Sequence, residues 1–214
     1  RLMIYNQHPR IDFRTEIDWQ EKQVMLKAAF PVDVRARFAT YDGAFGPVER
    51  STYRNTNWDV GHFEAVVHKW ADLSEGNYGV ALLNDCKYGM DIHENVMRLT
   101  LLRSPMYPDP TADLGQHSFT YSLLPHAGDW RTAQIHREGY GLNMPLRAAL
   151  IGFPNADGTL PAKASFVHLN ANHVVVETVK RSETDPDVWI VRVYETMNCR
   201  NASVQATFER PIRH

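Results

Sequence analysis

The chain has 214 residues, with 23 lysines and arginines and 25 aspartates and glutamates, so the formal net charge is −2. That length fits one large domain or two small ones at about 150 residues per domain, and the balanced charge lacks the basic surface of a nucleic-acid-binding protein. Hydrophobic residues at 43% and charged residues at 22% are typical of a globular protein and argue against a disordered chain.

Features of export and membrane insertion are missing from the sequence. No apolar run approaches the roughly 20 residues of a transmembrane helix, and the first residues lack the apolar core of a signal peptide. The two cysteines, Cys86 and Cys199, are expected to be free thiols in a reducing compartment, so we expect a cytoplasmic protein. Because position 1 is an arginine rather than a methionine, we also expect the chain to be a piece of a longer protein.

Apolar and polar residues alternate over short runs, which is the period of a half-buried β-strand. In the first run, residues 10–19, Ile11 and Phe13 begin an apolar face that continues to the end of the run. A polar turn at residues 21–23 and a second apolar run at residues 24–31 then predict a long hairpin.

Similar runs continue through the rest of the chain. They lie at residues 62–69, 78–84, 96–103, 117–124, 164–170, 174–180, 188–194 and 203–209. Turn-forming residues separate several of them, at residues 42–43, 75–77, 157–158 and 184–187. Strands therefore dominate the predicted structure.

One segment, from Asp129 to Gly139, breaks this pattern and predicts a single short helix, because an aspartate suits the start of a helix and a glycine its end. Repeated short strands with one helix predict an all-β protein built as an antiparallel β-sandwich. Residues 143–145 and the loop at residues 154–158 are expected to separate two β units. We therefore predict a β domain over residues 1–142 and a smaller terminal β-sandwich segment over residues 143–214.

Ten histidines raise the question of a metal site. The strong zinc motifs, His-Glu-x-x-His and Cys-x-x-Cys, are missing from the sequence. His62 and His68 fall on one predicted strand, about 20 Å apart at roughly 3.3 Å per residue, which is too far to share an ion. His93, His117 and His126 can meet only through the fold. We predict no metal site in this chain.

Motifs for a catalytic nucleophile are missing as well, including the Gly-x-Ser-x-Gly elbow. Lys87 lies beside Cys86 and would lower the pKa of the thiol, but lone cysteines at strand ends are more often buried and structural. Some of the many carboxylates must lie in pairs, yet only their separation would identify glycosidase chemistry. The carboxylate pattern is therefore unspecific.

Two polar, aromatic-rich segments, residues 53–59 and 84–91, combine planar rings with amide, carboxylate and cationic groups. Sugars are bound by this mixture, since rings stack on their C–H faces while polar groups bind their hydroxyls. The alternative is that these side chains only stabilise loops through bonds to the backbone.

These segments also carry a resemblance to a known family. Residues 53–59, 68–75, 78–89, 99–105 and 109–121 resemble the C-terminal region of glycoside hydrolase family 38 α-mannosidases, in the cytosolic and bacterial branch, and residues 174–180 and 191–195 resemble that family's terminal β domain. The string Asn-Asp-Cys-Lys-Tyr-Gly at residues 84–89 is the most specific match.

The resemblance implies a galactose-mutarotase-like supersandwich followed by a terminal β-sandwich unit. It also implies a retaining exo-mannosidase whose zinc ligands and aspartate nucleophile lie in an N-terminal α/β domain, with a helical bundle between. This chain matches neither, so zinc is expected only in the full-length enzyme and not bound by this fragment. The expected partners are an α-mannoside substrate and the N-terminal catalytic and helical domains, with no nucleic acid or membrane. Assembly into a homo-oligomer is left open.

In such enzymes the β region lends loops to the rim of the active-site cleft. Basic or aromatic side chains whose positions suit contact with the sugar are Arg54, Trp58, Lys87, Tyr88 and Arg103.

The main hypothesis is therefore the C-terminal β portion of an α-mannosidase, which shapes the cleft and supports the catalytic domain. The alternative is a freestanding carbohydrate-binding β-sandwich that binds a sugar through Trp58 or Tyr88. A third option is a mutarotase-like enzyme that uses a histidine and a glutamate as acid and base. An exposed apolar docking face would favour the first hypothesis, whereas a surface that is polar all round would favour the second.

Overall fold

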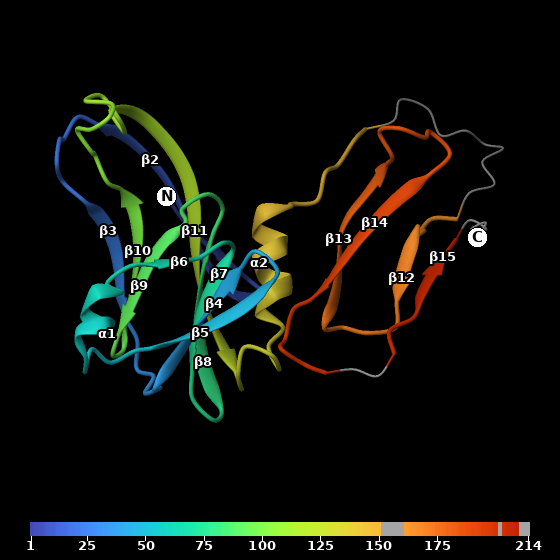
Figure 1. The fold of residues 1–214 in the computed structure, drawn as a ribbon, viewed down its shortest axis with the longest axis horizontal. Helices are drawn as coiled ribbons and strands as arrows, with labels where there is room; N and C mark the ends of the chain where they lie inside the picture. Colours follow the sequence, from blue (N-terminus) through green and yellow to red (C-terminus); the bar gives the residue numbers. More distant parts are fainter. Residues whose placement is uncertain (151–160, 201–202, 210–214) are drawn as a thin grey trace. The chain divides into compact units, whose positions relative to one another are not determined.

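A computed structural model describes residues 1–150, 161–200 and 203–209 of the chain (Figure 1). Its contacts divide the chain into two compact units, Arg1–Pro145 and Leu146–His214. No helix among the described residues has the length and apolar character needed to cross a membrane.

The larger sheet of the first unit is antiparallel and has seven strands. Their spatial order is β1 (Leu2–Tyr5), β2 (His8–Trp19), β11 (Gly115–Ala127), β8 (Tyr78–Asn84), β7 (Trp70–Ser74), β4 (Phe38–Gly43) and β5 (Gly46–Ser51). The second sheet has four strands, in the order β3 (Leu26–Pro31), β10 (Val96–Leu102), β9 (Gly89–His93) and β6 (Ala65–Val66).

The two sheets enclose one hydrophobic core. Leu73 and Leu82 of the larger sheet belong to the same buried cluster as Met90, Met97 and Leu99 of the smaller one. Along β10 buried and half-buried residues alternate, because successive side chains of a strand point to opposite faces. The predicted all-β antiparallel sandwich is confirmed.

The predicted hairpin over residues 10–31 is wrong. β2 pairs with β1 and β11 in the larger sheet, whereas β3 pairs with β10 in the smaller one. Both strands turn an apolar face to the same core from opposite sides, and the rings of Phe13 and Phe30 meet with centroids 5.4 Å apart. The alternation of the sequence predicted the faces of these strands correctly but not their partners.

The predicted helix over residues 129–139 is displaced along the chain. α2 spans Ile135–Asn143, and Asp129 instead accepts the backbone N–H of Thr132 in a preceding turn, at 2.9 Å. Gly139 lies inside the helix, where an added Cβ would come within 2.9 Å of Trp70. The glycine therefore allows α2 to pack closely on β7 rather than ending the helix.

A second helix was not predicted. α1 spans Asn57–Gly61, next to a segment predicted as the strand 62–69, of which only β6 is extended. The short strands β1, β4, β5, β7 and β9 also escaped prediction.

The second unit contains two small antiparallel sheets. β12 (Val167–Leu169) pairs with β15 (Ala206–Phe208), and β13 (Val174–Arg181) pairs with β14 (Trp189–Glu195). The predicted turn at residues 184–187 is confirmed, since the Asp185 carboxylate accepts the Asp187 N–H there at 2.9 Å. The predicted loop at residues 154–158 and its turn at 157–158 lie outside the described residues.

Candidate functional site

The short helix α1 is fixed by its own first residues. Thr56 and Asp59 form a capping box, in which the Thr56 hydroxyl accepts the Asp59 N–H at 3.2 Å and the Asp59 carboxylate accepts the Thr56 N–H at 2.9 Å. The Thr56 hydroxyl and the backbone N–H groups of Thr56 and Asn55 hold the pKa of Asp59 below its usual range. None of the helix residues is buried, so this box rather than packing defines α1.

A charged cluster covers the outer face of the four-stranded sheet. Lys27 lies 2.5 Å from a carboxylate oxygen of Glu64 and 2.7 Å from one of Asp91. Arg98 approaches Asp91 to 2.9 Å and Arg54 approaches it to 3.6 Å. Burial alone would lower the pKa of Lys27, but the hydrogen bonds to Asp91 and Glu64 outweigh it and raise that pKa. The cluster thereby fixes Arg54 and Glu64, the two ends of the segment that carries α1.

A pocket of about 220 Å³ opens between β5, the α1 segment and β9. Its apolar floor includes Tyr41, which is 3% exposed, and Ile92. Burial raises the pKa of the Tyr41 hydroxyl, which therefore stays neutral at ordinary pH. The lining residues are Tyr41, Glu49, Arg50, Ser51, Thr52, Tyr53, Arg54, Asp59, His62, Ala65, Asp91 and Ile92.

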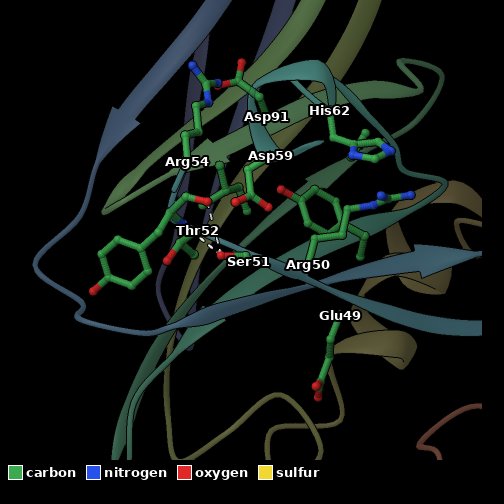
Figure 2. A pocket seen from close by; sticks show the side chains of 12 residues that line it. Glu49, Arg50, Ser51, Thr52, Arg54, Asp59, His62 and Asp91 are labelled. Atoms are coloured by element: carbon green, nitrogen blue, oxygen red, sulfur yellow. Dashed lines mark hydrogen bonds and ion pairs between the residues drawn. The ribbon is translucent and has the colours of Figure 1, made fainter. Parts of the chain in front are cut away.

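Two groups of polar side chains border this pocket. Figure 2 shows Arg54 beside Asp91 on one side and Arg50 beside His62 on the other, with Asp59 between them. Arg50 and Glu49 are neighbours in β5, so their side chains leave the strand on opposite faces. In Figure 2 Glu49 accordingly points away from the other labelled side chains. The pocket thus presents both hydrogen-bond donors and acceptors.

The structure places the five predicted sugar-binding residues in separate surroundings. Arg54 lines the pocket, and Trp58 projects from α1 with 79% of its surface exposed, its ring stacked on that of His62 at 6.4 Å. Neither Lys87 nor Tyr88, both between β8 and β9, is among the lining residues. The Lys87 ammonium instead lies 4.5 Å from the centroid of the Phe119 ring.

Tyr88 is exposed and meets His68 edge to face, with ring centroids 5.9 Å apart. Arg103 is also exposed, directly after β10, where its backbone N–H donates to Asp113 at 3.0 Å. Only Arg54 and Trp58 are therefore brought to the pocket segment.

Sequence reasoning missed Arg50, Asp59 and His62 as pocket residues. The spacing of Thr56 and Asp59 is a capping-box signal that would have predicted α1, directly before the segment predicted as a strand. For Arg50 the sequence offers no such signal, because its place depends on strand pairing with β4.

The cysteines and the two histidines weighed as metal ligands lie in different surroundings from those predicted. Both cysteines are free and exposed. Partial burial and the neighbouring carboxylate of Asp85 raise the pKa of Cys86 to about 11, the opposite of the lowering expected from Lys87. His62 and His68 do not share a strand, since His62 ends α1. Within the described ranges no three or more His, Cys, Asp or Glu side chains are grouped as metal ligands.

Comparison with a known family covers most of the first unit. Residues 1–111 match the family described as the glycosyl hydrolases family 38 C-terminal domain. The chain belongs to this family. Family 38 was the resemblance seen in the sequence, and it is confirmed.

Relatives within family 38 are much longer than this chain. It is 43% identical over 195 residues to alpha-mannosidase G of Dictyostelium discoideum. This match covers 91% of the chain and 18% of that relative. It is also 43% identical over 190 residues to human alpha-mannosidase 2C1, covering 87% of the chain and again 18% of the relative. The chain thus spans about a fifth of the length of these relatives.

Among solved structures, an alpha-mannosidase from Enterococcus faecalis V583 matches 97% of the chain and 24% of its own length, with a TM-score of 0.83 and 18% identity. At that identity the likeness concerns the fold alone.

Proposed function

We propose that this chain is the C-terminal β portion of an α-mannosidase, a glycosyl hydrolase that releases terminal α-mannosyl residues with retention. The observation that carries this proposal is the family 38 C-terminal match over residues 1–111. The relatives that share this region are named α-mannosidases, and the chain corresponds to 18% of their length. The chemistry is therefore assigned to the complete enzyme and not to this segment.

The carboxylates of the pocket suit a supporting role better than a catalytic one. A retaining glycosidase needs one carboxylate as nucleophile and one carboxylic acid as proton donor. Asp91 is held by Lys27 and Arg98, and Asp59 is held by its capping box. In this proposal the nucleophile and the zinc ligands both belong to the N-terminal catalytic domain.

The α1 segment supplies a surface for those missing domains. Val60, Phe63 and Val66 lie within seven residues of one another and are 57%, 61% and 65% exposed. Exposed apolar side chains concentrated in one short segment are typical of a contact with another protein surface. This surface supports the proposal that the chain packs against the catalytic and helical domains of its own enzyme.

The remaining assignments follow from the same proposal. In this proposal Arg54, which lines the pocket, and Trp58 contact the α-mannoside. Lys87, Tyr88 and Arg103 lie outside the pocket, on other loops. The free cysteines support a cytoplasmic location.

Hydrolysis of a chromogenic α-mannoside tests the proposal. The full-length protein encoded with this segment is expected to turn over the substrate, to lose activity with a chelator and to regain it with zinc or cobalt. The 214-residue chain is expected to show no turnover under the same conditions. Metal-dependent turnover by the chain alone would place a complete active site here and overturn the assignment.

A further inference from the structure

We propose that the pocket beside α1 binds one neutral hexose unit of an α-mannoside glycan, through Arg50, Asp59 and His62. This inference rests on the proposed function. The donors and acceptors of the pocket indicate a sugar, and the proposed α-mannosidase activity indicates that the sugar is mannose. Arg50 comes from β5, Asp59 from the middle of α1 and His62 from its C-terminal cap. Figure 2 shows the three side chains around the same space.

Asp59 offers a free acceptor. One of its carboxylate oxygens, Oδ2, receives the backbone N–H groups of Asn55 and Thr56 and the Thr56 hydroxyl. In the described part of the chain, no group donates a hydrogen bond to its other oxygen, Oδ1. The capping box thus uses one half of the carboxylate and holds the whole group rigid, with the other half available to a ligand hydroxyl.

Arg50 offers unused donors. Its guanidinium carries five N–H groups, yet it forms no ion pair within the described ranges. In the pairing of β5 with β4, Arg50 lies opposite Ala39, which is buried in the core. Cross-strand partners share a face, so the side chain of Arg50 leaves the strand on the core side, at the mouth of the pocket.

His62 adds a second acceptor. Its Nδ1 lies 2.8 Å from the carbonyl oxygen of Trp58, and a carbonyl can only accept, so Nδ1 carries the hydrogen. In the neutral ring Nε2 then bears a lone pair. The same bond orients the ring, and Trp58 stacks on it with an interplanar angle of 20°.

The charges around the pocket argue against a metal ion and against an anion as the ligand. Arg50 and Arg54 would repel a metal ion, whereas Asp59 and Asp91 would repel an anion. A neutral ligand with several hydroxyls satisfies fixed donors and fixed acceptors together, because each hydroxyl both donates and accepts. The volume of about 220 Å³ lies below the roughly 300–1,000 Å³ of pockets for drug-sized ligands, which suits a single sugar ring.

Titration of the 214-residue chain with methyl α-mannoside tests this site, with backbone amide NMR signals of residues 50–62 as the readout. We expect saturable shifts at those amides. Arg50→Ala and His62→Ala are each expected to weaken binding about tenfold, the equivalent of one lost hydrogen bond. Because both side chains are exposed, the variants are expected to fold, which a thermal melt verifies.

Arg14→Ala is the matched control, since it removes an exposed arginine that does not line this pocket, and it should bind as the parent does. Parallel titration with inorganic phosphate separates a sugar site from an anion site, and tighter phosphate binding at the same amides would overturn the proposal. So would a folded parent chain that shows no mannoside shifts, or binding that both variants leave unchanged. Turnover by the full-length protein is measured separately, so the proposed function can stand where this inference fails.

Discussion

The two faces of the four-stranded sheet are built from the same strands but have different roles. On the inner face Met90, Met97 and Leu99 are fully buried in the core. On the outer face Asp91 and Arg98, from those same strands, join the charged cluster. Apolar burial is non-directional and secures the sandwich, whereas ion pairs and hydrogen bonds fix particular atoms. The outer face can therefore position the α1 segment and its pocket while the inner face supplies most of the stability.

Leu99→Ala is expected to give the largest effect. The side chain is fully buried, so its truncation removes apolar contact and leaves a cavity, at a cost of about 2–5 kcal/mol of unfolding free energy. Urea denaturation measures the loss. Amide signals of residues 50–62 in the folded variant should keep their positions, because the outer face is untouched. Widespread shifts at those residues would show that the two faces are coupled.

Lys27→Met is expected to give a smaller loss of stability and a clear change at the pocket. Removing the ammonium leaves Glu64 and Asp91 without a shared cation, at a cost of about 1–3 kcal/mol for bonds between charged groups. The α1 segment should loosen at its Glu64 end, since Glu64 loses its cation, whereas Arg54 keeps its contact with Asp91.

Arg14→Met is a matched control for this change, because the ion pair between the Arg14 side chain and Glu16 is exposed and 4.0 Å long, and such pairs contribute little. If Lys27→Met lost as much unfolding free energy as Leu99→Ala, the division of roles between the two faces would be contradicted.

These expectations also show what the sequence could specify. Strands such as β8 and β10 were predicted nearly to the residue because their apolar patterns are strong and local. Pairing was not predicted, since the alternation of residues 10–31 fits a hairpin as well as two strands in opposite sheets. The strand predicted at residues 62–69 failed because the capping box of Thr56 and Asp59 starts a helix just before it.

The pocket was the least predictable feature. Its walls come from β5, the α1 segment and β9, so it exists only once non-local strand pairs have formed. The sugar-binding prediction for residues 53–59 rested on composition, and it singled out Arg54 and Trp58 but passed over Asp59. Composition indicates which chemistry a segment can offer, whereas only the fold decides which atoms remain free.

Acid is expected to release α1 before the sandwich unfolds. The pKa of Asp59 lies below the ordinary value of about 3.9, so the ionised carboxylate stabilises the folded helix above that value. This contribution is lost as the pH falls through the folded-state pKa. The amide signals of Asn55 and Thr56 should titrate together there, and Asp59→Asn should abolish the transition. A midpoint at or above about 3.9 would contradict the role of the capping box.

The smallest effect on stability is expected for Trp58→Ala. The ring is 79% exposed and α1 contributes no buried residue, so the unfolding free energy should change by no more than about 0.5 kcal/mol. If the ring is a platform for sugar, mannoside affinity should nevertheless fall, because stacking on the C–H face is lost. Tyr107→Ala is a matched control, as that ring is also highly exposed and lies on a different loop. A large loss of stability for Trp58→Ala would mean that the ring serves packing within this chain, and the functional reading of the α1 segment would then lose its main support.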